Sequence, residues 1–370
     1  MKYGPAPMRG YLAVHHALKP MVQKTMNFKE DVMRICADAY VRQVVQLLPT
    51  SSFLELNEPL SLMAALNGVP GVKFIDSMNF SSSAGFPHNR SKRDFITRLA
   101  PEAPWQHPVV VNSAMKAEIA EIWNLMHQGV RCAPVFMQHL KDEALPLHKV
   151  AAGKARVFMG GPFAWSVCVR MLFLPFVRIM QLNKYLFEGA PGTNTTSIEW
   201  TRLYQYLTRF GTDRCIAGDF KSYDKIMGSL VILEAFRIII EICEMSGLEP
   251  SHLLAMQTVA EDTAFAFVNY NGDLMMFFGS NPSGHPLTVI INCIVNSLYM
   301  RYCYYELNPD HEVHTFRSNV ALITYGDDNA MGSRVDWFNH TTVAAALANV
   351  GIVYTMADKE SETVPFLNIS

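Results

Sequence analysis

The sequence has few charges and no paired cysteines. Charged residues make up 17% of it, and a formal net charge of −2 provides no overall basic surface, so a nucleic-acid site would require local clusters of Lys and Arg. Its seven cysteines are scattered and never form a C-x-x-C pair, which argues against both a disulfide framework and a zinc site. The N-terminus has no apolar run of signal-peptide length. For the cysteines, a reducing compartment is the simplest inference.

The sequence also lacks long uninterrupted hydrophobic runs. Its longest apolar stretches, 230–242 and 287–300, are broken by charged residues and by Asn side chains, respectively, so we expect no membrane span. Internal repeats and low-complexity tracts are absent too. Half of the residues are apolar, however, and a chain of 370 residues can bury a substantial core in two domains or one large one.

Turn-rich segments divide the chain into blocks. They lie at 79–89, 189–197 and 279–286. Residues before about 188 mix short helical patterns with a basic extended segment. Residues 201–370 alternate helical and strand patterns, which predicts one α+β layer.

Four carboxylates follow predicted strands in this second block. Asp219 lies near the end of a strand over 215–220, and Asp224 comes five positions later. Asp327 and Asp328 occupy the tip of a hairpin that follows a strand over 320–325. Two further elements are predicted after it, a helix over 341–350 and a strand over 352–355.

Bare carboxylates are rare at buried strand ends, because desolvating an unpaired charge is costly unless a cation compensates it. Asp219, Asp327 and Asp328 are therefore candidate metal ligands. Oxygen ligands suit Mg²⁺, and two ions about 4 Å apart could activate a 3′-hydroxyl and stabilise a leaving pyrophosphate. The alternative is that Gly-Asp-Asp is only a favourable turn and Asp219 a helix cap.

Polar residues recur every four positions on an apolar helix that opens with the loop 281–286. They are Thr288, Asn292 and Asn296. Together with Asp224, an Asn and a Thr there could bind a ribose 2′-hydroxyl and so select ribonucleotides. Alternatively, the Asn side chains are satisfied by backbone groups of the core.

A basic segment precedes the acids, over 139–160. Its cations, which could hold the oxygens of a triphosphate, are Lys141, Lys149, Lys154 and Arg156. A solvated basic face is the alternative, and two neighbouring acids dilute the charge.

In order and spacing these residues resemble the RNA-directed RNA polymerases of picorna-like positive-strand RNA viruses. Motif A of that family is matched by Asp219 and Asp224, motif C by 325–328, and basic motif F by the cations named above. Motif B is matched by Ser283, Gly284, Thr288 and Asn292. The segment 82–87, within 79–93, resembles the template-entry loop, which implies template contacts at Ser83, Gly85 and Pro87. The segment 357–359 resembles motif D, which implies that Lys359 protonates the leaving pyrophosphate.

The resemblance implies an α+β right-hand fold with fingers at 1–200 and a palm at 201–370. Its antiparallel palm sheet would pack on helices, and 243–280 would return to the fingers. We expect the helical thumb to be absent, and the chain to be a core fragment, because the sequence stops before the family's primer grip.

The implied activity is RNA-templated RNA synthesis by two-metal nucleotidyl transfer, for replication and transcription of a viral genome. The resemblance also implies two Mg²⁺ ions, for which Mn²⁺ can substitute, and the binding of RNA template, primer and nucleoside triphosphates. A protein primer and other viral replication proteins are implied partners. The implied location is the host cytoplasm, at membrane-associated replication complexes.

Two other functions remain open. A reverse transcriptase shares palm aspartates, but Thr288 and Asn292 beside Asp224 favour ribonucleotides. A fragment that only binds RNA is compatible with a missing thumb, whereas the intact acids argue against it.

Overall fold

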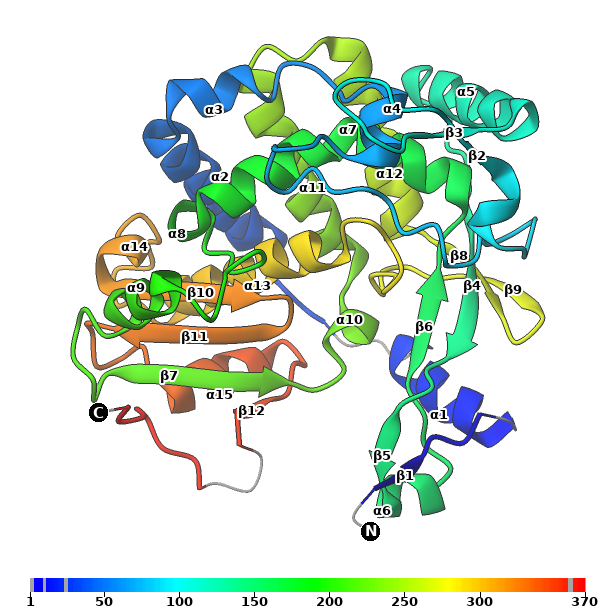
Figure 1. The fold of residues 1–370 in the computed structure, drawn as a ribbon. Coiled ribbons are helices and arrows are strands. Elements are labelled where there is room, and N and C mark those ends of the chain that lie inside the picture. Colours follow the sequence, from blue (N-terminus) through cyan, green and yellow to red (C-terminus); the bar gives the residue numbers. More distant parts are fainter. Residues whose placement is uncertain (1–2, 9–10, 23–25, 359–361, 370) are drawn as a thin grey trace.

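The computed structural model describes residues 3–8, 11–22, 26–358 and 362–369. Figure 1 shows helices gathered in the upper part of the molecule and a sheet at the lower left. A second sheet at the right descends toward the N-terminal strand (Figure 1).

Helices are found in both halves of the chain. Those of the first half are α1 (Tyr11–Val22), α2 (Glu30–Leu47), α3 (Thr50–Leu54), α4 (Leu62–Asn67), the 3₁₀ helix η1 (Lys92–Phe95), α5 (Ser113–His127), α6 (Leu147–Ala151), α7 (Phe163–Leu182) and α8 (Lys184–Phe187). Those of the second half are α9 (Ile198–Leu207), α10 (Tyr223–Ile226), α11 (Ser229–Met245), α12 (Pro250–Ala264), α13 (Thr288–Leu307), α14 (Phe316–Asn319) and α15 (His340–Asn349).

Local polar groups start several of these helices. Asn112 accepts a hydrogen bond from the Met115 N–H at the start of α5 (2.9 Å), and Asn339 accepts one from the Thr342 N–H at the start of α15 (3.1 Å). The Thr342 hydroxyl accepts from the Asn339 N–H in return. Pro250 begins α12, where the missing N–H would have had no partner within the helix.

The hairpin sheet is a four-stranded antiparallel sheet in the order β10-β11-β7-β12. Its strands are β7 (Cys215–Phe220), β10 (Val320–Tyr325), β11 (Asp328–Ser333) and β12 (Tyr354–Met356). Helix α13 packs against β10, and α15 packs against β7 and β12. The α+β class with an antiparallel sheet on helices is confirmed. The predicted strand over 352–355 begins two residues later than expected. No helix follows β12 in the described residues.

The mixed sheet has the order β6-β4-β8-β9. Its strands are β4 (Val135–Leu140), β6 (Val157–Gly160), β8 (Phe267–Tyr270) and β9 (Asp273–Met276). Strands β4 and β8 pair in parallel, which joins part of the predicted 243–280 insertion to the basic segment. The domain boundaries themselves remain a prediction.

Two short antiparallel ribbons complete the described strands. One joins β1 (Tyr3–Pro5) to β5 (Ala144–Pro146), and the other joins β2 (Ile96–Arg98) to β3 (Val109–Val111). In Figure 1 the first ribbon and α6 lie at the lower end of the mixed sheet.

Helix α7 is apolar over most of its surface. By length and composition alone it could cross a membrane, the one described helix to which this applies, and 78% of its most apolar window is buried inside the molecule. Its rings Trp165, Phe173 and Phe176 are among the largest fully buried side chains. Burial of this kind is also what a core helix shows.

A buried ion pair joins α13 to the rest of the molecule. Arg301 on α13 bonds both carboxylate oxygens of Glu188 (2.6 and 2.8 Å), and each side chain is 1% exposed. The backbone carbonyl of Glu188 accepts from both the N–H and the hydroxyl of Thr324 on β10 (2.8 and 2.7 Å). Burial alone would raise the pKa of Glu188, but the Arg301 guanidinium outweighs it and the pKa lies below the ordinary value.

Replacing Glu188 with Ala should therefore destabilise the fold strongly. The change leaves the Arg301 guanidinium buried without its partner, which typically costs about 3–5 kcal/mol of unfolding free energy. Urea denaturation measures the loss. Lys29→Ala breaks the exposed Lys29–Glu306 pair and is the control, with no expected change in midpoint. Equal effects of the two substitutions would contradict this role for the buried pair.

Candidate active site

Helix α13 holds the hairpin between β10 and β11 in place. Gly326 and Asp327 form its turn, with Gly326 in the left-handed region (φ +65°). Asn296 on α13 is fully buried and donates its Nδ2 to the carbonyls of Gly326 (3.1 Å) and Asp327 (3.0 Å). Its Oδ1 accepts from Asn329 (3.1 Å). The turn's backbone is thus satisfied, while the side chains of Asp327 and Asp328 are exposed.

Asp219 is brought to this hairpin by strand register. Gly218 lies opposite Asn329 in the β7–β11 pairing, so Asp219 follows at the level of the hairpin tip. A Cβ at Gly218 would lie 2.1 Å from the ring of Tyr354. That ring packs over β7 and its hydroxyl donates to Asn329 (2.6 Å). Glycine before Asp219 is therefore a packing requirement.

Four acids, Asp219, Asp224, Asp327 and Asp328, form what we call the carboxylate cluster. Although Asp328 is exposed, neighbouring groups remove part of its hydration, which raises its pKa, and the charges of Asp327 and Asp219 raise it further. Burial also raises the pKa of Asp224; a hydrogen bond from Asn292 opposes the rise and the Asp327 charge adds to it. These charge effects link Asp328 to Asp327 and Asp219, and Asp224 to Asp327, so the four acids are electrostatic neighbours.

The cluster does not enclose a metal ion by itself. No three His, Cys, Asp or Glu side chains of the described residues gather closely enough to hold one. Among the ion pairs of the described part of the chain, none involves Asp327 or Asp328. The donor set still fits Mg²⁺, which commonly takes one or two carboxylates and fills its other positions with water and phosphate oxygens.

Asp224 and Asn292, predicted to act together, are in direct contact. Asn292 Nδ2 lies 2.5 Å from Asp224 Oδ1. The Tyr223 hydroxyl donates to the Asn292 carbonyl (2.9 Å), which fixes α10 against α13. The contact follows the expectation, whereas a role in sugar recognition remains a prediction.

The loop before α13 is seated on β6. Ser283 Oγ accepts from the Met159 N–H (3.3 Å), and a Cβ on Gly284 would lie 2.1 Å from the Met159 carbonyl oxygen. The Thr288 hydroxyl lies 2.8 Å from the carbonyls of Pro282 and His285. Thr288 thus closes its own loop, an arrangement that the sequence did not predict.

His285 anchors the other side of this loop. Its Nδ1 accepts from the Leu287 N–H (2.9 Å), so the neutral ring carries its proton on Nε2 and donates to the Thr263 hydroxyl on α12 (2.9 Å). Burial lowers the pKa of His285 to about 3, which keeps the ring neutral. This anchor could not be predicted from local sequence, because the partner of His285 lies on a different helix.

The basic segment only partly approaches the cluster. The positive charge of Arg156 partly opposes the rise in the pKa of Asp224, so the two groups are electrostatic neighbours. Arg156 and Lys141 both pair with Glu143 (3.4 and 3.2 Å). Lys149 on α6 and Lys154 are exposed, and α6 lies at the far end of the mixed sheet (Figure 1).

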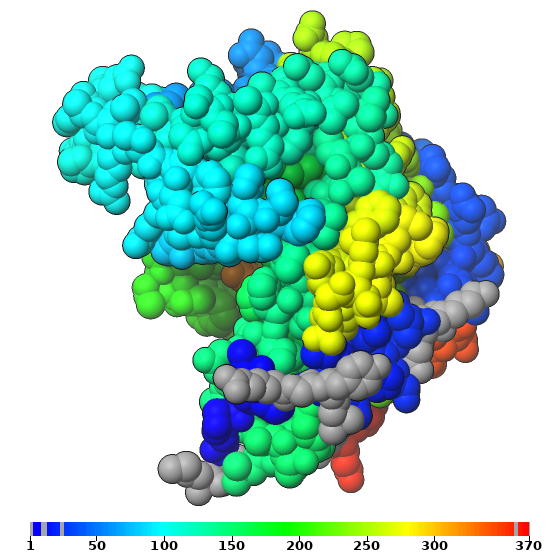
Figure 2. All heavy atoms as spheres, turned by 90° about the vertical axis from the view of Figure 1, so that its right-hand side faces the viewer, coloured from blue at the N-terminus to red at the C-terminus, as the bar shows by residue number. Residues whose placement is uncertain are grey.

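The predicted template loop is folded tightly against α7. Ser83 Oγ accepts from the Gly85 N–H (3.1 Å), and Gly85 adopts φ +72°. A Cβ there would lie 2.7 Å from the Gly161 carbonyl oxygen, so the loop backbone rests on the start of α7. Pro87 follows a cis peptide bond. Figure 2 shows the cyan part of the chain, which includes this loop, overhanging a hollow in the surface.

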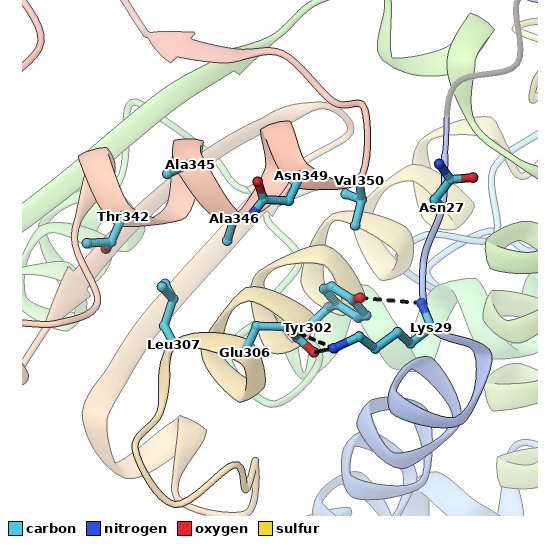
Figure 3. Close-up of a pocket in the computed structure, with 10 residues that line it drawn as sticks. All are labelled: Asn27, Lys29, Tyr302, Glu306, Leu307, Thr342, Ala345, Ala346, Asn349 and Val350. Atoms are coloured by element: carbon cyan, nitrogen blue, oxygen red, sulfur yellow. Dashed lines mark hydrogen bonds and ion pairs between the residues drawn. The ribbon is translucent and has the colours of Figure 1, made fainter.

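One predicted site residue, Lys359, lies outside the described residues. A cavity of about 430 Å³ lies elsewhere, between α13, α15 and the segment before α2 (Figure 3). Lys29 and Glu306 face one another there at 3.1 Å, and the Lys29 N–H donates to the Tyr302 hydroxyl (3.3 Å). The cavity shares no lining residue with the carboxylate cluster.

Comparisons with known proteins match nearly the whole chain. A family model described as viral RNA-dependent RNA polymerase matches residues 3–370. The replicase polyproteins of Cricket paralysis virus and Drosophila C virus are 30% and 28% identical over 89% and 92% of this chain, and the chain spans 20% of each. The RNA1 polyprotein of Cowpea mosaic virus is 29% identical over 83% of the chain, which spans 17% of it. A Sicinivirus 3Dpol RNA-dependent RNA polymerase structure has a TM-score of 0.80 at 20% identity, covering 100% of this chain and 73% of that one.

The fit of Gly284 on β6 can be tested by adding one methyl group. Gly284→Ala should destabilise the protein by about 1–3 kcal/mol, because its Cβ would overlap the backbone of Met159. Gly160 pairs with Gly284 in the same contact, yet a Cβ there meets nothing within 4 Å. Gly160→Ala is therefore the matched control in urea denaturation. Equal stability of the two variants would show that the loop is not held in this position.

Proposed function

Because this chain belongs to the viral RNA-dependent RNA polymerase family, we propose that it carries the site that extends an RNA strand along an RNA template. The convergence of Asp219 with the Asp327–Asp328 hairpin is the observation that carries the proposal. Carboxylates gathered in one place repel one another, and binding of cations with a polyphosphate substrate would offset that repulsion.

Asp219, Asp327 and Asp328 would hold two Mg²⁺ ions, for which Mn²⁺ can substitute. Bound there, the ions would supply charge neutralisation at the attacking 3′-oxygen and at the leaving pyrophosphate. The chain's own contribution is positional. Asn296 fixes the backbone that bears two of the acids, so that they need not be organised when substrate arrives.

Recognition of the nucleotide would use groups around the cluster. The Asp224–Asn292 pair supplies both an acceptor and a donor for sugar hydroxyls. Arg156, beside Asp224, would bind triphosphate oxygens. Lys141, Lys149 and Lys154 would add positive charge along the path by which the nucleotide approaches. Ser283, Gly284 and Thr288 would shape the loop against which the incoming base pair packs.

The remaining roles are proposals that rest on the family. Ser83, Gly85 and Pro87 would contact the template, and Lys359 would donate a proton to the leaving group. The partners would be an RNA template and primer, nucleoside triphosphates, a protein primer and other viral replication proteins. The proposed setting, replication complexes at membranes of the host cytoplasm, likewise rests on the family resemblance alone.

Asp327→Ala should abolish primer extension by the protein that contains this chain. Loss of a metal-binding carboxylate is expected to slow incorporation at least about 100-fold. Asp273→Ala removes an acid from another two-residue hairpin, β8–β9, and is the matched control with unchanged incorporation. Elongation by the Asp327 variant at the wild-type rate would refute the metal assignment.

The pKa of Asp328 gives a test that needs no activity. Because its pKa is raised in the fold, Asp328 costs stability as the pH rises from the ordinary carboxyl pKa to the raised one, and the full cost remains above that. Asp328→Asn should therefore raise the urea midpoint in EDTA at pH 7. The gain should shrink near pH 4, where an ordinary carboxyl also takes up a proton.

Addition of Mg²⁺ at pH 7 should reverse this order, because the wild-type protein gains more stability from a bound cation than the variant does. Urea titrations with and without Mg²⁺ measure both effects. A wild-type protein that is more stable than Asp328→Asn in EDTA at pH 7 would contradict the electrostatic account of the cluster.

A further inference from the structure

Asn281, at the start of the loop before α13, contacts both members of the Asp224–Asn292 pair. Its backbone N–H donates to the Asp224 carbonyl (2.9 Å), and its Nδ2 donates to Asn292 Oδ1 (2.8 Å). The Asn292 Nδ2 in turn lies 2.5 Å from Asp224 Oδ1. Three hydrogen bonds thus form a closed triangle in which Asn281 is 3% exposed.

Donor and acceptor chemistry fixes the direction of this triangle. An ionised Asp224 only accepts, so Asn292 must turn its Nδ2 toward the carboxylate, which leaves its Oδ1 in need of a donor. Asn281 Nδ2 is that donor. If the Asn292 amide flipped, its oxygen would face the carboxylate and its NH₂ would face the NH₂ of Asn281. Both contacts would be repulsive, so Asn281 reinforces the amide orientation that Asp224 favours.

The loop around Asn281 holds it in place. The Ser280 N–H donates to the Met227 carbonyl (2.7 Å), and the Ser280 hydroxyl donates to the Lys225 carbonyl (2.6 Å). Asn281 Nδ2 also lies 3.4 Å from the Thr288 carbonyl. Its Oδ1 is buried without a hydrogen-bond partner in the described part of the chain, which leaves one acceptor unused beside the pair. The loop therefore holds the Asn281 side chain in position beside the Asp224–Asn292 pair.

We propose that Asn281 is a positioning residue that determines specificity for ribonucleotides. It sets the Asn292 amide so that the Asp224–Asn292 pair meets the nucleotide's sugar hydroxyls with a fixed donor and a fixed acceptor. This inference rests on the proposed polymerase function. Asn281 acts through Asn292 and does not take part in the chemical step.

Asn281→Asp is the sharpest variant, because it keeps the shape of the side chain and removes the donor. Its ratio of kcat/KM for NTP to that for dNTP should fall about tenfold, the size of one lost hydrogen bond to a polar partner. The change should lie mainly in KM for the NTP, while kcat for dNTP is retained. Asn281→Ala should give the same direction of change. Ser280→Ala loses a neighbouring buried hydrogen bond without touching the triangle, and its ratio should stay within about twofold of wild type.

A double-mutant cycle with Asn292→Ala separates positioning from general stability. In that background Asn281→Ala should change the NTP to dNTP ratio no further, because its partner is gone. Unchanged discrimination in both single Asn281 variants, equal losses for both nucleotide types, or a full effect in the Asn292→Ala background would each overturn the inference. A wild-type protein that incorporates no nucleotide would instead count against the proposed function.

Discussion

The amide of Asn296 and the carbonyls of the Gly326–Asp327 turn form the contact on which the site depends. A tight turn pressed against a helix must have its carbonyls satisfied, and Asn296 provides the donors from within the core. One turn earlier on the same helix, Asn292 holds Asp224. Further along, Arg301 ties the helix to Glu188 and thereby to β10. Two buried Asn side chains on one face of α13 therefore position acids that come from separate parts of the sequence, while Arg301 anchors the helix from another face.

Much of this arrangement could be predicted from local patterns. The apolar runs that precede the acids predicted the observed bounds of β7 and β10. The Gly-Asp-Asp turn lies where the hairpin was expected. The four-residue spacing of Asn292 and Asn296 correctly placed them on one polar face. Asn296 binds backbone carbonyls, as the structural alternative for that face expected, and Asn292 contacts Asp224, whereas sugar recognition by this pair remains a prediction.

Features that depend on distant contacts could not be predicted. The partner of His285 lies on α12, and the need for glycine at Gly284 comes from β6; neither has a local sequence signal. Asn281 looked like an ordinary turn residue before proline. Helix α7 was not recognised as the longest buried apolar helix because Arg170 and Arg178 interrupt its pattern, and both reach backbone carbonyls outside the helix. Roles that need substrate, such as those of Lys149 and Lys154, remain predictions.

The parallel pairing of β4 with β8 has a consequence for synthesis of the protein. A chain emerging from the ribosome presents β4 and β6 long before β8, and it presents β7 long before β11. Until the later strands emerge, β4 and β7 each expose an open edge able to pair with other chains. The carboxylate cluster therefore cannot assemble until α13 and the hairpin have left the ribosome. Translational pausing between α12 and β11 would prolong the interval in which the nascent chain is prone to aggregate.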